Sequence, residues 1–187
     1  MSFDISKFRS AGLKSSGARP NLFECSLTNV PPGVSSLGLT NFNFMCKGVS
    51  GIPSSTLGTI VVPYFGRNVK IPGNRTFDNL SVTVINDEDF KIRNAIEQWM
   101  NNLNSHQSNK SAITTAGQSG NLSGEMAIQH FDRAGNAISG AKWSFTNVYP
   151  VALGEIALDW GSNDTIEEFT IDFAYDYWTH GQNTPNL

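Results

Sequence analysis

The last strand-like segment of the chain, residues 166–178, most restricts what this sequence can fold into. Two sets of side chains alternate along it, with Phe169, Ile171, Phe173, Tyr175 and Tyr177 in one set and Glu168, Thr170, Asp172, Ala174 and Asp176 in the other. Successive side chains of a β-strand point to opposite faces, so the pattern predicts one face on a core and one face in water. A strand covered on only one side is typical of an antiparallel sheet.

Other segments with the same two-residue period predict the remaining strands of this sheet. They are residues 21–27, 42–46, 76–85, 125–131, 137–145 and 155–160. We expect the first two to pair with each other in an antiparallel hairpin, with Phe42, Phe44 and Cys46 on one face of the second. Cys25 and Cys46 then share a face, and without a secretory signal two reduced, buried thiols are favoured over a disulfide.

One long helix is predicted over residues 87–103. Asn86 or Asp87 can cap its first amides, and the acidic residues that follow suit the positive end of the helix dipole. An apolar stripe at helical spacing, widened by Met100, consists of Ile92, Ile96, Trp99 and Leu103. The fold class expected is therefore mostly β (α+β), an antiparallel β-sandwich or barrel-like domain with one main flanking helix.

The length of 187 residues predicts a single domain, 1–187. Within it we expect a mobile N-terminal arm at residues 1–17 and a flexible polar loop at 104–124. Residues 47–74, rich in Gly, Pro and Ser, predict an extended loop or ribbon, and residues 179–187 a loose tail. A ribbon of this length in a compact domain is a candidate contact surface.

Residues with catalytic or metal-binding chemistry are not gathered into a recognisable motif. His106, His130 and His180 lack partners at ligand spacing, and the Gly117–Gly120 segment lacks the second glycine of a nucleophile elbow. The acids between Asp159 and Glu168 suit turns better than a Ca²⁺ loop. A net charge of -3 disfavours a surface that holds phosphates. We expect no enzyme, no cofactor, no metal and no membrane binding.

A set of motifs, taken in order, resembles the tail tube family of contractile-tailed bacteriophages. They are Ala18–Phe23, Phe44–Lys47, Gly73–Asp78, Val82–Asp87 leading to a helix with Trp99, Val148–Pro150, Leu153–Ile156, Leu158–Trp160 and Phe173–Trp178. Each motif alone is weakly specific, whereas their order and spacing over residues 18–178 are specific together.

This resemblance implies a structural role rather than catalysis. Six copies would form a ring whose sheets join into one continuous inner β-barrel, and rings would stack helically into a conduit for viral DNA inside a contractile sheath. The partners implied are other copies, the tail sheath protein, baseplate tube-initiator proteins, the tape measure protein, transiting DNA and the tail terminator. The implied location is the tail of the virion, after assembly in the host bacterial cytoplasm.

Two surfaces are candidates for this role. The acidic face of the last strand, with Glu168, Asp172 and Asp176, faces either the lumen or bulk water. If it is luminal, repulsion of like charges keeps DNA from adhering to the wall. The second surface is a ring-stacking segment within the ribbon, formed by Ser54, Ser55, Thr56, Leu57, Thr59 and Ile60.

Three other functions remain open from the sequence. A baseplate tube-initiator, or the secreted tube of a type VI secretion system, would have the same fold, and copy number separates an initiator from a tube. A β-sandwich module that binds glycans is a more distant alternative, because the Trp residues are favoured as core or interface anchors over sugar platforms.

Overall fold

The computed structural model describes residues 5–6, 17–31, 33–34, 36–108, 110–111 and 123–181. Most of the expected N-terminal arm, much of the 104–124 loop and residues 182–187 of the tail lie outside these ranges. The elements are β1 (Phe23–Asn29), η2 (Ser36–Leu39), α2 (Phe42–Met45), β2 (Cys46–Ser50), β3 (Thr56–Tyr64), β4 (Arg67–Thr76), β5 (Leu80–Ile85), α3 (Lys91–Leu103), β6 (Gly124–Phe131), β7 (Ala137–Leu153), β8 (Glu168–Ala174) and β9 (Tyr177–His180).

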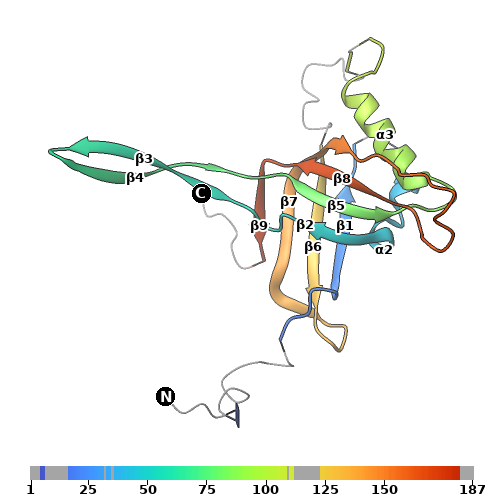
Figure 1. Cartoon of the computed structure of the whole chain (residues 1–187), viewed down its shortest axis with the longest axis horizontal. Helices are drawn as coiled ribbons and strands as arrows, with labels where there is room; N and C mark the ends of the chain where they lie inside the picture. The colour runs from blue at the N-terminus through green and yellow to red at the C-terminus, as the bar shows by residue number, and fades with distance from the viewer. Residues whose placement is uncertain are drawn as a thin grey trace.

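Seven strands form one antiparallel sheet in the order β1-β6-β7-β8-β5-β2, and β9 also pairs with β7 (Figure 1). The other two strands, β3 and β4, form a separate ribbon that extends away from the sheet. The mostly β, antiparallel character with one main helix agrees with the expected fold class. The ribbon covers Thr56 to Thr76, whereas residues 47–50 of the expected 47–74 ribbon belong to β2.

Strand β7, 17 residues long, spans the sheet from one end to the other. Its first part pairs with β6 on one side and with β9 on the other, and its last part pairs with β8. The expected single strand 166–178 is therefore two strands, β8 and β9, on the same side of β7. The break falls at Tyr175 and Asp176, where the Asp176 amide still donates to the Thr146 carbonyl at 3.1 Å.

The core lies between the inner face of the curved sheet and helix α3. Strand β8 contributes Phe169, Ile171 and Phe173, which are all buried, as the alternation of the sequence predicts. Tyr175 is also buried, but Tyr177 is 43% exposed, so the expected inward face ends at the break before β9. The inward residues of β5, Leu80, Val82 and Val84, complete this layer and are fully buried.

Helix α3 places the predicted stripe against the sheet. Ile92, Ile96 and Trp99 are buried and Leu103 is partly buried, and the Trp99 ring lies 6.4 Å from that of Phe173. The helix begins at Lys91 rather than at residue 87, so the expected cap by Asn86 or Asp87 is wrong. Residues 87–90 form a turn instead, in which the Phe90 amide donates to the Asp87 carbonyl, and Phe90 has a left-handed φ of 51°.

The expected strand at 42–46 is also wrong. Residues Phe42–Met45 form the short helix α2, which buries Phe42 and leaves Phe44 80% exposed. The expected pairing with 21–27 does not occur, because β1 pairs with β6 and β2 pairs with β5. Apolar residues two apart do not distinguish one helical turn from a strand when the segment is this short.

Candidate assembly surfaces

The β3–β4 ribbon is the most exposed element of the described structure. Every residue from Thr56 to Thr76 except Gly73 is exposed, and so are large apolar side chains at Leu57, Ile60, Val61, Val62, Tyr64, Val69 and Ile71. A two-stranded hairpin standing alone is marginally stable in water. Exposed apolar patches on such an element mark contact sites, so the ribbon is a candidate contact surface.

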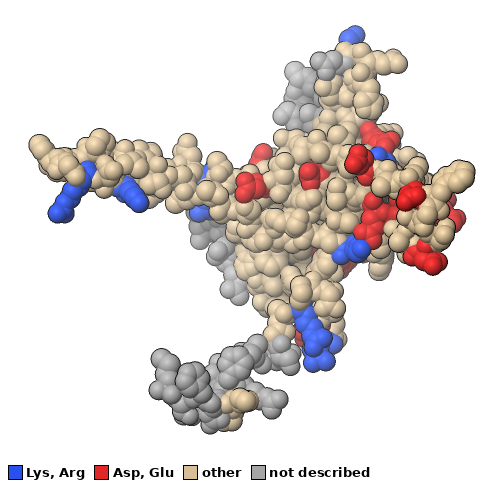
Figure 2. All heavy atoms as spheres, in the orientation of Figure 1, with Lys and Arg blue, Asp and Glu red and all other residues tan. Residues whose placement is uncertain are grey.

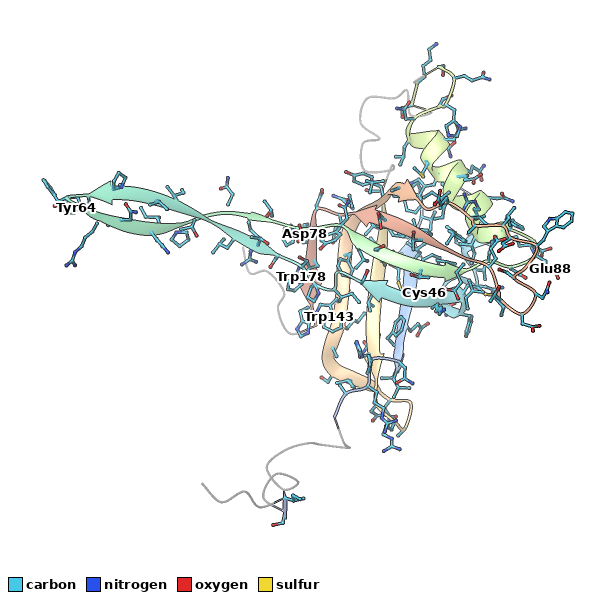
Figure 3. The ribbon with its side chains drawn as sticks, viewed as in Figure 1. Cys46, Tyr64, Asp78, Glu88, Trp143 and Trp178 are labelled. Atoms are coloured by element: carbon cyan, nitrogen blue, oxygen red, sulfur yellow. The ribbon has the colours of Figure 1, made fainter. Side chains whose placement is uncertain are left out.

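The tip of the ribbon carries a strained aromatic residue. Phe65 has a φ of 40° and is 93% exposed, and its ring stands edge-on to Tyr64 with centroids 4.7 Å apart (Figure 3 labels Tyr64). Two-residue hairpin turns with positive φ favour Asn, Asp or Gly at this position. Apart from this contact with Tyr64 the Phe65 ring is exposed to water, and backbone strain of this kind is found at functional sites.

The ribbon is also positively charged. Residues 56–76 include Arg67, Lys70 and Arg75 and no Asp or Glu. Figure 2 shows these cations along the ribbon, while most carboxylates on this face gather at the opposite end of the molecule. A subunit with this polarity favours contacts in which the ribbon of one copy meets the acidic end of another.

Two free sheet edges form a second candidate surface. No strand in the described ranges pairs with the outer edge of β2. Strand β6 ends its pairing with β7 at Val148, so residues 149–153 of β7 are paired only with β8. Tyr149 and Val151 are partly exposed on this segment, at 39% and 40%. Unpaired edges of this kind are templates for pairing with another chain.

The outward face of β8 is polar, but its charge is partly balanced. Lys47 Nζ lies 2.5 Å from Glu168 Oε1, so β2 supplies a cation that offsets the charge of Glu168. Asp176 accepts a hydrogen bond of 2.5 Å from Asn147 Nδ2. Asp172 belongs to none of the ion pairs of the described residues, and its partner positions on β5 and β7 are the small residues Ser81 and Ala152.

The histidines expected to lie apart are partly brought together. His130 of β6 and His180 of β9 pack on the ring of Trp143, with centroids 5.7 and 5.6 Å away (Figure 3 labels Trp143). The histidines are far apart in the sequence, and only the pairing of β7 with both β6 and β9 unites them. Among the described residues, no group of His, Cys, Asp and Glu is arranged to hold a metal ion.

The ring-stacking segment predicted from the sequence is divided between the ribbon and the body. Ser54 Oγ donates to Asp78 Oδ2 at 2.5 Å, and the Tyr175 hydroxyl lies 3.5 Å from the Ser54 carbonyl oxygen. Thr56, Leu57, Thr59 and Ile60 lie in β3 and are exposed. The exposed half of the segment is thus available to a partner, whereas Ser54 anchors the base of the ribbon.

None of the helices described is long and apolar enough to cross a membrane.

Comparison with known proteins gives consistent matches across nearly the whole chain. A family model described as phage tail tube protein matches residues 18–181. The tail tube protein gp19 of Enterobacteria phage T4 is 31% identical over 161 residues, which cover 86% of this chain and 90% of that protein. The tail tube protein of Serratia phage KSP90 is 25% identical over 171 residues, covering 91% and 93%.

Solved structures show a shared fold. A chain of the PVC extracellular contractile injection system, in its extended sheath–tube complex, has a TM-score of 0.58 and 19% identity, covering 96% of this chain and 98% of that one. A chain of the anti-feeding prophage baseplate has a TM-score of 0.61 and 15% identity, covering 89% and 97%.

Proposed function

Because this chain belongs to the phage tail tube protein family, we propose that six copies close into a ring and that rings stack helically into the DNA conduit. The chain is a structural, non-enzymatic subunit of the tail tube of a virion. The observation that carries the proposed assembly is the exposed apolar ribbon, because an isolated hairpin of this kind needs a partner surface.

Ring closure uses the two free edges. Strands β7, β8, β5 and β2 form a continuous four-stranded portion of the sheet whose two outer edges are the 149–153 segment and β2. Pairing the β2 edge of one copy with residues 149–153 of the next would extend the sheet around an axis. A closed barrel leaves no free edge, so six copies remove the aggregation liability that each monomer carries.

The outward face of these four strands then lines the lumen. Helix α3 packs on the inner, core-facing side of the sheet, so it lies away from the lumen and toward the sheath. Asp172 provides a luminal carboxylate free of any ion pair in the described ranges, and Asp176 another, while Glu168 contributes less because Lys47 offsets it. Repeated in every ring, these carboxylates repel DNA phosphates along the wall.

Stacking between rings uses the ribbon. Its exposed apolar residues and its three cations suit the acidic end of a subunit in the adjacent ring. The other partners of the assembled tube are the sheath protein around it, the initiator and terminator at its ends, and the tape measure protein and DNA inside. A contact along the axis that does not close on itself yields an open helical stack.

The test shortens the ribbon without disturbing its base. Deleting residues 54–60 would abolish stacking but would also remove the Ser54 hydrogen bonds to the body. Replacing residues 59–72 with Asn-Gly instead closes a short turn between Gly58 and Gly73, which already face each other across the ribbon. We expect the variant to unfold cooperatively at nearly the temperature of the unmodified protein and to form no tubes in negative-stain images.

A matched control carries a change on the far side of the sheet. Asn94→Lys alters an exposed position of α3 and should leave tubes unaffected. Hollow tubes of normal width from the shortened variant would contradict the role of the ribbon. Single rings from the unmodified protein, without tubes, would favour a tube-initiator.

A further inference from the structure

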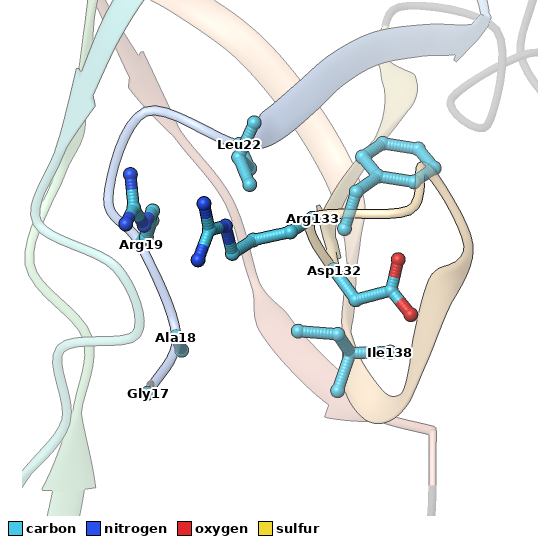
Figure 4. A pocket seen from close by; sticks show the side chains of 8 residues that line it. Gly17, Ala18, Arg19, Leu22, Asp132, Arg133 and Ile138 are labelled. Atoms are coloured by element: carbon cyan, nitrogen blue, oxygen red, sulfur yellow. The ribbon is translucent and has the colours of Figure 1, made fainter. Parts of the chain in front are cut away.

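A pocket of about 370 Å³ lies between the start of β1 and the β6–β7 turn (Figure 4). Leu22, Phe131 and Ile138 are its large apolar residues, and Arg19 and Arg133 also line it. The Phe131 amide donates to the Leu22 carbonyl at 2.9 Å, which ties two of these residues together. We call this site the arginine pocket. Its volume lies in the range of pockets that enclose an organic group.

Within the described ranges, Arg19 and Arg133 have no carboxylate partner. Both side chains line the pocket, their guanidinium groups point into the same region of Figure 4, and neither takes part in an ion pair of the described residues. Asp132 also lines the pocket, but its Oδ1 accepts hydrogen bonds from the Ala134 and Asn136 amides, both at 2.8 Å. Its carboxylate points away from both guanidinium groups (Figure 4). Two adjacent, unpaired guanidinium groups favour a carboxylate ligand.

The chain carries a segment with matching chemistry at residues 154–167, which we call the acidic loop. Trp160 is 100% exposed there, and Leu158 and Ile166 are exposed as well. The carboxylates of the loop are Glu155, Asp159, Asp164 and Glu167. The Gly161 amide donates to Asp159 Oδ1 at 2.9 Å, so the turn that presents Trp160 is internally organised. An exposed indole on an ordered turn is typical of an interface anchor.

We propose that the arginine pocket of one subunit binds the acidic loop of a second copy, with Trp160 against the apolar walls and the loop carboxylates on Arg19 and Arg133. This proposal deepens the proposed function, because it depends on contact between identical subunits. The pocket lies at the start of β7 and the loop follows the end of β7, so the strand separates them by about 50 Å of chain. A contact between them joins unlike ends of two copies, as assembly into rings or stacks requires.

Other segments of the chain fit the pocket less well. The turn before α3 is acidic, but its Asp89 is paired with Lys91 and its Phe90 is only 38% exposed. The ribbon has aromatic residues but no carboxylate. DNA phosphates would satisfy the arginines and leave the apolar walls in contact with water.

The test places a photo-crosslinking residue, p-benzoylphenylalanine, at position 160 of the full chain. This variant, with natural isotopes (the light protein), is mixed with unmodified protein labelled with heavy isotopes (the heavy protein). The mixture is concentrated until tubes form, and crosslinked peptides are identified by mass spectrometry. We expect heavy peptides that contain Leu22 or the 131–138 turn. Adding Arg133→Glu to the heavy protein should lower the crosslink yield about ten-fold, as loss of a charge-assisted hydrogen bond predicts.

A compensating change and a control complete the design. Adding Asp164→Lys to the light protein should restore most of the crosslink yield lost with Arg133→Glu, because the loop then supplies a cation to the carboxylate introduced in the pocket. Lys110→Glu in the heavy protein, at an exposed site outside the pocket, should leave the yield unchanged.

The two proposals fail in different ways. If unmodified protein forms no tubes under any condition, the proposed function fails. If tubes form but position 160 crosslinks to its own subunit, to residues 1–16, to another surface or to nothing, the arginine pocket proposal is overturned while the tube remains.

Discussion

Cys25 and Cys46 lie within hydrogen-bonding reach of each other in the core, although their strands, β1 and β2, are at opposite ends of the sheet order. The sheet therefore curls until its first and last strands are in contact. Helix α2 lies beside both strands and fills the remaining space with the buried ring of Phe42. Both cysteines are free thiols, so side-chain packing rather than a disulfide holds the two ends together.

The thiol contact predicts a dependence of stability on pH. The hydrogen bond to Cys46 and burial raise the pKa of Cys25 well above its usual value, and the same contact lowers the pKa of Cys46. Above about pH 8.5 the unfolded chain loses the Cys25 proton while the folded chain keeps it. The lowered pKa of Cys46 acts in the opposite direction, but the shift of Cys25 is the larger, so the free energy of unfolding should fall. Urea unfolding between pH 7 and 10 measures this. Cys25→Ala should show a shallower decline above pH 8.5, and an equal slope would contradict the assignment.

Two of the four tryptophans, Trp99 and Trp160, can be compared for their contribution to the free energy of unfolding. Trp99 is 1% exposed and packs near Phe173, whereas Trp160 is fully exposed. Trp99→Ala should cost about 3–5 kcal/mol of unfolding free energy, because it leaves a cavity between α3 and the sheet. Trp160→Ala should change monomer stability by less than about 0.5 kcal/mol. Equal losses in urea unfolding would show that the acidic loop packs on the body.

The strained ribbon tip predicts that one substitution should stabilise the monomer and weaken tube assembly. Phe65→Asn places a residue that tolerates left-handed φ at the turn and should stabilise the monomer by up to about 1 kcal/mol. The same change removes an aromatic side chain that we expect a neighbouring subunit to cover. The variant should therefore require a higher protein concentration than the unmodified protein to form tubes. Sedimentation and thermal unfolding measure the two effects. Unchanged assembly would mean that the tip contacts no neighbour.

The free edge of β7 predicts a ring defect. Val151→Lys puts a charge on the 149–153 segment, a device that blocks edge-to-edge pairing. We expect folded monomers that fail to close rings in sedimentation velocity and negative-stain images. Asn94→Lys adds the same charge on α3 and should assemble normally. Normal rings from Val151→Lys would place the subunit contact at another surface.

The lumen assignment predicts DNA retention when one charge is reversed. Asp172→Lys introduces a cation that repeats in every ring, so tubes should co-sediment with DNA in a salt-sensitive manner. Tubes of Glu97→Lys, which makes the same exchange of a carboxylate for a cation at an exposed position of α3, carry the same net charge and should bind less DNA if α3 faces outward. Equal DNA binding by the two variants would identify the β8 face as an ordinary solvent-exposed surface.

The sequence predicts best those features that depend on residues close together in the chain. The burial of Phe169, Ile171 and Phe173 follows from a two-residue period, and the inward side of α3 from a helical one, because both depend only on neighbours in the chain. The sequence does not fix the helix start, because the acids of residues 87–89 suit the first turn of a helix as well as the turn that precedes Lys91. Phe42–Met45 was misassigned because four residues cannot fix a period.

By itself, the sequence determined the alternation of the strands, the apolar stripe of the main helix and, through ordered motifs, the family. Only the tertiary structure decided which strands pair, where the last strand breaks at residues 175–176, and which edges remain free. It alone brought Cys25 beside Cys46 and placed Arg19 and Arg133 in the lining of one pocket. The physical reason is that local patterns record which way each side chain faces, whereas strand pairing joins residues distant in the chain through backbone hydrogen bonds that are nearly the same for every sequence.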